Sequence, residues 1–328
     1  MAATRDRPAP CIRIGISACL LGQEVRFDGG HKRDPFLTDT LSAQVEFVSI
    51  CPEVEMGLGT PRETLRLVRV DDASSPLRMV TTRTAIDHTD GMSRWATKRL
   101  EQLTRDEPDL CGYVLKKDSP SCGMERVKTY SAGGISERNG RGLFAAALMG
   151  RFPNLPVEEE GRLNDPRLRE NFIERVFAYR RLKDLFAGNW SLGALVAFHT
   201  AHKMTLLAHS TTRYTELGQL VARGREMPRR ELREAYESAF MATLKIVATN
   251  RRHTNVLSHM SGHLKKQLDS DSKRELIRTI DEYRLGLVPL IVPLTLLRHH
   301  VRVHSVAYLA NQTYLEPHPR ELMLRNHV

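Results

Sequence analysis

The sequence predicts an α/β domain with a largely parallel sheet, followed by an all-α helical domain. The chain has 328 residues, which exceeds one average domain and fits two. Up to about residue 150, short β-branched runs alternate with a helical pattern, as is typical of an α/β layer. From residue 166 onward, apolar residues recur three and four positions apart, as they do along amphipathic helices. We therefore expect one domain over residues 1–155 and a second over residues 156–328.

The first domain is expected to contain three short buried strands and at least one helix. The strands are predicted at residues 12–17 (IRIGIS), 45–50 (VEFVSI) and 113–115 (YVL), because turn residues bound each apolar run. Between the second and the third strand, residues 91–103 carry apolar side chains at helical spacing.

Residues 151–166 (RFPNLPVEEEGRLNDP) are predicted to form a linker. They include three prolines and an acidic run and show no periodicity. Asn164, Asp165 and Pro166 are then expected to form the cap and first turn of a helix. The helical segments expected beyond this point are RLRENFIERVFAYRRLKDLF, LGALVAFHTAHKMTLLAH, RRELREAYESAFMATLKIV, NVLSHMSGHLKKQL and SKRELIRTIDEYRLG.

Composition restricts the class of protein. A hydrophobic content of 41% and a charged content of 27% are typical of soluble globular proteins. The most apolar run, residues 285–297, is too short for a transmembrane helix and is interrupted by two prolines. The N-terminus lacks the apolar core of a signal peptide, so we expect a cytoplasmic protein. In that compartment, five widely spaced cysteines favour metal binding, catalysis or core packing over a disulfide scaffold.

The formal net charge of +10 lies mainly in the second half of the chain. Residues 1–155 hold 22 lysines and arginines against 20 acidic residues, whereas residues 156–328 hold 27 against 19. A basic half indicates a polyanionic partner, nucleic acid first, although a solvated basic surface would give the same count.

Three cysteines follow the three predicted strands. Cys19, Cys51 and Cys122 come after the first, second and third strand in turn. Ligands bind α/β sheets outside the carboxyl ends of the strands, so these thiols could converge. Three thiolates would fit an iron–sulfur cluster with one open iron, or a zinc site closed by a fourth ligand, although no CxxC pair is present. Three unrelated cysteines are the alternative, and core packing is the preferred interpretation for Cys11 and Cys111.

Polar side chains lie close to these cysteines in the sequence. Asp28 stands in the turn VRFDGG, Glu53 just after the second cysteine, and Lys116 and Ser121 just before the third. A carboxylate beside a metal-bound substrate could act as a general base for water. For each residue alone, a solvated turn or a cap is the alternative role.

Four segments of the first domain together resemble the thiouracil desulfidase family. They are SACLLGQEVRFDGG, SICPEVEMGLGTPRETLRL, LKKDSPSCG and GRGLFAAAL, in that order, within about residues 12–150. Members of that family carry a [4Fe-4S] cluster on three cysteines and remove sulfur from thiolated pyrimidines as hydrosulfide. The resemblance implies that Cys19, Cys51 and Cys122 hold such a cluster and that its fourth iron is open.

The resemblance also implies roles for the neighbouring polar residues. The open iron would bind the substrate sulfur, and water would attack the ring carbon without net redox change. Glu53 or Asp28 is the candidate base for that water. Lys116 and Ser121 are candidates for hydrogen bonds to the substrate or to cluster sulfurs.

The second half resembles the YbgA-like helical domain over about residues 168–300. The segments that carry this resemblance are FIERVFAYRRLKDLF, LVAFHTAHKMTLLAHS, YTELGQLV and NVLSHMSGHLKKQL. Fusions of the two domains resemble bacterial desulfidases that convert 4-thiouridine in tRNA to uridine. The resemblance therefore implies tRNA as the substrate, with the helical domain assisting its binding. The chain departs from the family pattern at His263, where the family has an aromatic residue.

Phosphate contacts to tRNA would come from basic residues of the second half, and they would make affinity fall with salt. For any one pair of these basic residues, a position on a solvated helix face is an equally good explanation. A base buried in a stack would also have to flip out to reach iron. The candidates are Arg229, Arg230, Arg233, Arg251, Arg252, Lys265 and Lys266, with Lys273 and Arg274 as a further pair.

Eleven of the 13 histidines lie at or beyond residue 199. Their spacing permits a metal site, but no carboxylate or cysteine joins them in the right register. Phosphate contact and packing are the alternatives. The closely spaced members are His199, His202, His209, His259 and His263.

A tRNA 4-thiouridine desulfidase is thus the main hypothesis. A desulfidase of free thiouracil or a thionucleotide would differ in lacking salt-sensitive tRNA binding. A non-enzymatic iron–sulfur sensor or nucleic-acid-binding regulator would release no hydrosulfide. A zinc-stabilised binding module would be colourless.

Overall fold

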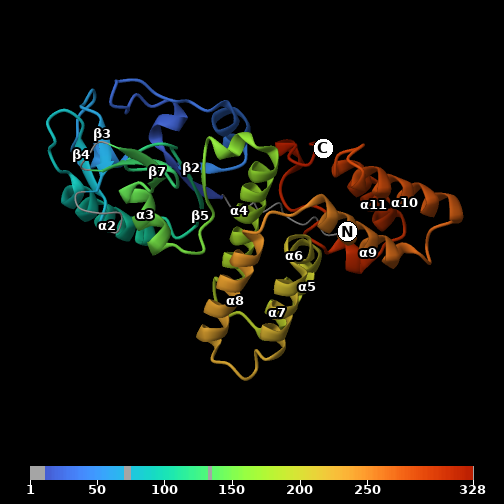
Figure 1. Ribbon diagram of the computed structural model, residues 1–328. Coiled ribbons are helices and arrows are strands. Elements are labelled where there is room, and N and C mark those ends of the chain that lie inside the picture. The colour runs from blue at the N-terminus through green and yellow to red at the C-terminus, as the bar shows by residue number, and fades with distance from the viewer. Residues whose placement is uncertain (1–11, 70–74, 132–134, 328) are drawn as a thin grey trace. The chain divides into compact units, whose positions relative to one another are not determined.

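The computed structural model describes residues 12–69, 75–131 and 135–327. The chain divides into two compact units, Met1–Asn164 and Asp165–Val328. A parallel sheet with helices in the first unit and helices throughout the second confirm the predicted fold class (Figure 1). None of the helices in the described part of the chain combines the length and apolar composition needed to cross a membrane.

The main sheet of the first unit contains four parallel strands in the order β2-β1-β5-β8. They are β1 (Arg13–Ser17), β2 (Glu46–Ile50), β5 (Leu110–Leu115) and β8 (Val157–Glu159). All six residues of β5 are buried, as expected for a central strand covered on both faces. The predicted strands at 12–17, 45–50 and 113–115 correspond to β1, β2 and a longer β5.

Helices α2 (Thr89–Asp106) and α3 (Leu143–Arg151) pack side by side along the sheet (Figure 1). The α2 helix contains the helix predicted at residues 91–103. Phe144 joins the layers, with its ring centroid 5.4 Å from Trp95 on α2 and 5.8 Å from Tyr113 on β5. Gly15 permits this packing, because a Cβ there would lie 2.2 Å from the Tyr113 ring.

Four short helices connect the early strands, and the sequence analysis did not predict them. They are η1 (Ala18–Leu21), η2 (Phe36–Thr40), η3 (Leu41–Ala43) and α1 (Pro52–Glu55). Two of them, η1 and α1, begin where β1 and β2 end.

A second, mixed sheet has the order β4-β3-β6-β7 and was likewise not predicted. Its strands carry charged residues at several positions, so they lack the apolar runs that identified the main sheet. They are β3 (Leu65–Val68), β4 (Arg78–Thr81), β6 (Val127–Tyr130) and β7 (Ser136–Gly140).

The predicted linker at residues 151–166 is wrong over most of its length. Its middle forms β8, in which Val157 lies opposite Tyr113 of β5, and Arg162–Asn164 form the short helix η4. The acidic run at 158–160 is not part of a solvated linker. All three glutamates are buried and have partners within the first unit. The boundary between the units therefore lies at residue 164 rather than at 155.

The second unit is helical throughout its described residues. Asp165 caps its first helix, α4, by accepting hydrogen bonds from the backbone N–H groups of Arg167 and Leu168, as predicted. The segment predicted as one helix over residues 192–209 is two helices, which break at His202. The helices are α4 (Pro166–Phe186), α5 (Leu192–Ala201), α6 (Lys203–His209), α7 (Thr211–Ala222), α8 (Arg229–Leu244), α9 (Asn250–Leu264), α10 (Ser270–Arg284), α11 (Ile291–Val303), α12 (Ala307–Ala310) and η5 (Arg320–Leu322).

A hydrophobic core unites α9, α10 and α11, which lie together in Figure 1. Leu257, Leu276 and Leu294 are fully buried representatives of the three helices. Pro293 is tolerated in α11 because it occupies the first turn, where its missing N–H has no intrahelical partner.

Candidate functional site

A cavity of about 310 Å³ in the first unit brings the three strand-end cysteines together. Cys19, Cys51 and Cys122 all line it. Two of these thiols are buried, and that of Cys51 is partly exposed. Cys111, which we interpreted as a core residue, is completely buried within β5, and Cys11 lies outside the described residues.

The sheet order explains this convergence. The strands β2, β1 and β5 are direct neighbours, and Ser17 at the end of β1 lies opposite Ile50 at the end of β2. Cys51 follows that end directly and Cys19 lies in the short helix after β1, so both reach the same edge of the sheet. Adjacent strands are separated by only about 4.8 Å. Cys122 belongs to the turn after β5, on the other side of β1.

Side-chain hydrogen bonds hold the turn that carries Cys122. Ser119 Oγ accepts hydrogen bonds from the backbone N–H groups of Ser121 and Cys122, at 3.3 and 3.1 Å. The hydroxyls of Ser119 and Ser121 are themselves 2.9 Å apart. The thiol is therefore presented by a turn whose own polar groups are paired.

The N-terminus of α3 also forms backbone hydrogen bonds to the same turn. Leu143 N–H donates to the carbonyl of Pro120, and Ala145 N–H to that of Ser121, both at 3.1 Å. The backbone approaches so closely that a Cβ on Gly142 would lie 2.4 Å from the carbonyl oxygen of Ser121. Only glycine fits at this position without displacing the turn.

Glu53 and Asp118 are the carboxylates that line the cavity, and two side chains fix Glu53. Arg62 donates to Glu53 Oε2 from Nε and Nη2, and Ser121 Oγ donates to Oε1 at 2.7 Å. Arg62 also donates to the carbonyl of Val25 at 3.0 Å. Arg62 was not predicted as a site residue, although it stands in the segment SICPEVEMGLGTPRETLRL, because the sequence does not show which polar residues of that segment point inward.

The environment keeps the three thiols protonated in the absence of a cation. Burial raises the pKa of all three, to about 11 for Cys19. Lys116 partly opposes this at Cys19, and a hydrogen bond from Ser17 does so at Cys122. Thiolates at these positions require a bound cationic group.

Lys116 and Ser121, which were predicted to hydrogen-bond the substrate or the cluster, both line the cavity. Lys116 Nζ forms an ion pair with the buried Glu160 and donates to the carbonyl of Lys117 at 3.1 Å. Glu160 also accepts from the backbone N–H of Lys117 at 2.8 Å. The acidic run of β8 thus anchors the lysine segment that borders the site.

Asp28 does not lie among the residues that line the cavity. Its carboxylate accepts from the backbone N–H of Gly30 at 3.1 Å and pairs with Arg26 at 3.3 Å, and both contacts lower its pKa. Asp28 thus stabilises the two-glycine turn, which leaves Glu53 as the candidate base that faces the cavity.

The donor set of the cavity consists of sulfur. Within residues 12–69, 75–131 and 135–327, no three His, Cys, Asp or Glu side chains are grouped closely enough to surround one metal ion. The three cysteines nevertheless line one cavity, and soft thiolate donors of this kind are the usual ligands of iron–sulfur clusters.

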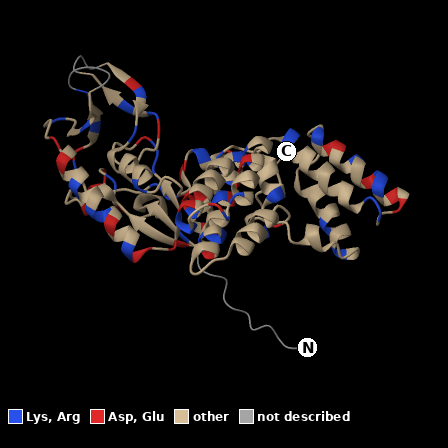
Figure 2. Ribbon diagram, turned by 90° about the horizontal axis from the view of Figure 1, so that it is seen from below, with Lys and Arg blue, Asp and Glu red and all other residues tan. Residues whose placement is uncertain are grey.

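The basic residues predicted to contact RNA lie on exposed surfaces of the second unit. Figure 2 shows lysines and arginines interspersed with acidic positions along its helices. Arg229 and Arg233 pack over the rings of Trp190 and Phe186, at 4.9 and 5.4 Å, and so also have a structural role. Arg230 pairs with Glu234. In the described chain, no ion pair involves the remaining four: Arg251, Arg252, Lys265 and Lys266.

Three of the closely spaced histidines, His199, His202 and His209, are buried and pack within the unit, whereas His259 and His263 are exposed. His199 Nδ1 lies 3.1 Å from the Tyr236 hydroxyl, and His202 stacks on Phe198. His209 lies 3.3 Å from the buried Glu174. His259 and His263 contact each other edge to face, with ring centroids 5.1 Å apart.

Comparison with known proteins gives a match for each unit. A family model described as 2-thiouracil desulfurase matches residues 14–160, and one described as a protein of unknown function (DUF1722) matches residues 203–319. The uncharacterised protein YbgA of Escherichia coli K12 is 33% identical over 165 residues, which cover 50% of this chain and 98% of YbgA. A solved structure of TudS, a [4Fe-4S]-dependent thiouracil desulfidase, is 32% identical and covers 47% of this chain and 94% of its own, with a TM-score of 0.37.

Proposed function

We propose that this chain, which belongs to the YbgA family and carries a 2-thiouracil desulfurase domain before its YbgA-like domain, converts 4-thiouridine in tRNA to uridine and releases hydrosulfide. One observation carries the proposal. Three thiols from the ends of β1, β2 and the turn after β5 line the same cavity as the fixed carboxylate of Glu53.

Cys19, Cys51 and Cys122 would hold a [4Fe-4S] cluster, the group on which TudS depends. Such a cluster supplies a Lewis-acidic iron that polarises the C–S bond of a thiolated base. Ser17 would donate a hydrogen bond to the Cys122 sulfur, and the Ser121 hydroxyl, whose proton goes to Glu53, lies 3.8 Å from the same sulfur. Hydrogen bonds of this kind orient ligands and tune the metal group.

Glu53 would take the proton of the attacking water. Each of its oxygens already accepts from Arg62 or Ser121, yet a carboxylate retains further lone pairs for a water molecule. The ring carbon gains an oxygen from water and loses its sulfur as hydrosulfide, which keeps the bonding electrons. The reaction is therefore a hydrolysis that needs no oxidant or reductant.

The cavity would hold both the cluster and the substrate, so its size supports no more than a single pyrimidine as the reacting group. Its volume of about 310 Å³ lies at the lower end of the range of small-molecule sites. A 4-thiouridine within tRNA would therefore have to leave its stack and enter alone.

The charge of the second unit supports a tRNA substrate. With the boundary at residue 164, the first unit holds 23 basic and 23 acidic residues, so the second unit carries the whole net charge of +10. A polyanion bound there would release counterions, and its affinity would fall steeply with salt.

The test compares 4-thiouridine-containing tRNA with free 2-thiouracil on the same anaerobically reconstituted protein. For tRNA, kcat/KM should fall steeply between 50 and 200 mM salt, on the order of a hundredfold or more if several phosphates are contacted. For the free base, it should change little. Turnover of the free base alone would favour the second candidate, a thiouracil desulfidase, which the family description supports.

A further inference from the structure

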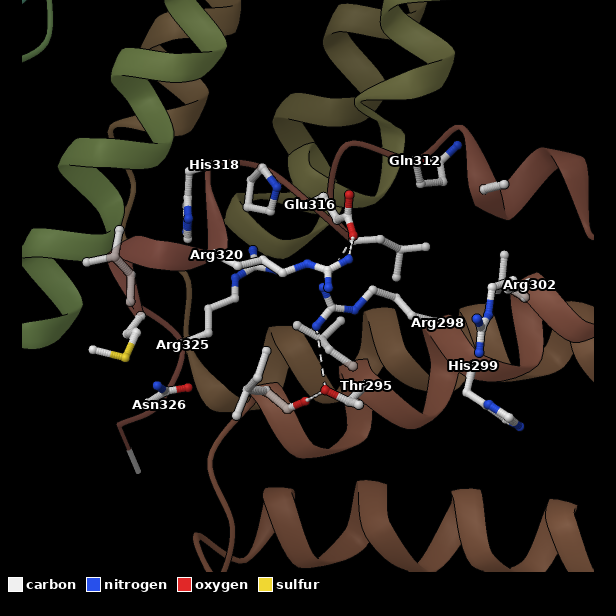
Figure 3. Close-up of a pocket in the computed structure, with 18 residues that line it drawn as sticks. Thr295, Arg298, His299, Arg302, Gln312, Glu316, His318, Arg320, Arg325 and Asn326 are labelled. Carbon is white, nitrogen blue, oxygen red and sulfur yellow. Dashed lines mark hydrogen bonds and ion pairs between the residues drawn. The ribbon is translucent and has the colours of Figure 1, made fainter. Parts of the chain in front are cut away.

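A second cavity, of about 890 Å³, lies in the helical unit and has no part in the reaction proposed above. Residues of α11 and of the segment 310–326 line it. Figure 3 shows the side chains of Arg298, Arg320 and Arg325 extending toward one another from separate parts of this wall. Arg302 is the fourth arginine of the lining and Glu316 its only carboxylate.

The positive charge of this cavity is not balanced from within. Glu316 Oε1 contacts Arg320 and lies 3.5 Å from Arg298 Nη1, so one carboxylate serves two arginines. Arg302 has no ion pair in the part of the chain that the structure describes. Arg298, Arg302 and Arg320 therefore exceed Glu316 by two positive charges.

Arg298 is also short of hydrogen-bond acceptors. Its side chain is 18% exposed, and its contacts to Glu316 and Thr295 are both at 3.5 Å, the outer limit of hydrogen bonding. Burial and the neighbouring Arg320 lower its pKa, as expected where like charges are held together. The guanidinium is half-buried, and its weakly engaged donors are available to an anion that enters the cavity.

Arg325 forms the inner wall. Its side chain is 4% exposed, and it donates to Glu170 from Nε at 2.9 Å and to the carbonyl of Tyr314 from Nη1 at 2.6 Å. Its Nη2 lies 3.7 Å from Glu174 and forms no hydrogen bond among the described residues. The two glutamates neutralise Arg325, and its Nη2 is closed to solvent, so Arg325 shapes the wall without adding net charge to the cavity.

We propose that this cavity binds the phosphate group of a nucleotide unit. The paired donors of a guanidinium match two phosphate oxygens, and Arg298 and Arg320 present such donors from two sides. Leu294 and Leu315 supply apolar wall for a sugar or base. The volume falls within the range of sites that hold small molecules of nucleotide size. The nucleotide is either free or part of an RNA chain, and the RNA alternative rests on the proposed function.

The test uses two probes, uridine 5′-monophosphate and an unmodified tRNA transcript. The variant is Arg302→Gln with Arg320→Gln, both exposed positions whose replacement spares the core. The matched control is Arg278→Gln with Arg284→Gln on α10, which removes the same charge from side chains that are 73% and 54% exposed. Losing two charged donors should weaken nucleotide binding by about tenfold or more, and the control should bind like the wild type.

The two probes distinguish the sources of the phosphate. If the variant loses affinity for both probes, and the salt dependence of tRNA binding becomes shallower by about two charges, the site takes a phosphate of the RNA chain. If it loses only the mononucleotide, the site serves a free nucleotide. If the wild type does not bind the mononucleotide and the variant binds tRNA like the control, the site does not exist.

Arg298→Lys adds a second check, because it keeps the charge and removes the paired donors. It should weaken mononucleotide binding several-fold. Unchanged affinity would mean that only the positive charge of the cavity attracts the nucleotide and that no specific phosphate site exists. Desulfuration of free 2-thiouracil, measured on every variant, reports on the first unit separately. If the wild type desulfurates neither free 2-thiouracil nor 4-thiouridine-containing tRNA, the proposed function is overturned and the nucleotide site is left untouched.

Discussion

Arg62 donates two hydrogen bonds to one oxygen of Glu53, from Nε at 2.9 Å and from Nη2 at 2.7 Å. The two side chains are 9% and 13% exposed, so water screens this ion pair little. The opposite oxygen of Glu53 accepts from Ser121, next to Cys122. The carboxylate is thus oriented before a substrate arrives, which is the arrangement a general base requires.

Replacing Arg62 should impair the chemical step. Arg62→Lys keeps the charge but cannot make both hydrogen bonds to Glu53. We expect kcat to fall by about 10- to 100-fold, as for other partners that orient a metal site, with little change in KM. The measurement is steady-state hydrosulfide release, together with the iron content of each preparation and the pH dependence of kcat.

Arg78→Lys is the control for Arg62, because Arg78 is exposed and pairs with Asp87 at 3.2 Å outside the cavity. It should retain the wild-type rate. A wild-type kcat for Arg62→Lys at full iron content would show that Glu53 does not depend on Arg62.

A methyl group on Gly142 should disturb the Cys122 turn. The new Cβ in Gly142→Ala would lie 2.4 Å from the carbonyl oxygen of Ser121 and 2.9 Å from the backbone nitrogen of Cys122. We expect reconstituted protein to hold less than half of the wild-type iron, with unchanged far-ultraviolet circular dichroism.

Gly150→Ala on the same helix has nothing within 4 Å of its new Cβ. It should load iron normally, and it should stabilise the fold by about 0.5–1 kcal/mol, because alanine favours a helix over glycine. Equal iron content in both variants would contradict the role assigned to Gly142.

Removing Arg325 should destabilise the helical unit. Arg325 is buried beside Glu170 and Glu174, and Arg325→Met leaves these carboxylates with only the histidines His327 and His209 as nearby partners. Breaking a buried pair on one side costs about 3–5 kcal/mol. Chemical denaturation would measure the loss, with the exposed Arg230→Met as a control that leaves the unfolding midpoint in place.

Acid should weaken the helical unit in a defined window. Burial lowers the pKa of His202 and His253 to about 3, so both are neutral in the folded chain. The unfolded chain binds these protons near pH 6.5, and stability is therefore lost as pH falls from 6.5 toward 3. The free energy of unfolding, measured between pH 7.5 and 5, should decrease by up to about 1.4 kcal/mol per pH unit for each of these histidines.

His202→Leu should make the loss of unfolding free energy with falling pH less steep. The ring is fully packed, its Nε2 has no hydrogen-bond partner within the described residues, and its Nδ1 lies 2.8 Å from the carbonyl of Phe198, so replacement removes the titrating group together with that one hydrogen bond. His263→Gln changes an exposed histidine of the same unit and should leave the slope unchanged. A slope that His202→Leu does not alter would mean that this group does not control acid stability.

The sequence predicted those elements whose apolar pattern is continuous. IRIGIS, VEFVSI and YVL identified β1, β2 and β5 because their apolar residues stand in short runs, although only β1 and β5 are largely buried and β2 lies at the edge of the sheet. The cysteines that follow them could be placed at one edge of the sheet. The two family resemblances are confirmed by the matches to both units.

The sequence could not show contacts that depend on partners distant in the chain. Glu160 looks like part of a solvated acidic run, but it is buried against Lys116, which lies 44 residues earlier. Arg62 and Asp28 both stand in polar turns, and only the tertiary structure turns the first toward the cavity and the second toward its own loop. The role of tRNA and the ligand set of the cluster stay predictions.

The most direct test of the account compares Cys122→Ala with Cys111→Ala. Both residues are buried cysteines of the first unit, but only Cys122 lines the cavity. Each protein is reconstituted anaerobically and incubated with 4-thiouridine-containing tRNA, and we would follow iron content, loss of the thiouridine absorbance and hydrosulfide release. The account predicts that Cys111→Ala performs like the wild type and that Cys122→Ala loses both cluster and turnover. A Cys122→Ala protein that still holds a full cluster and releases hydrosulfide would contradict it.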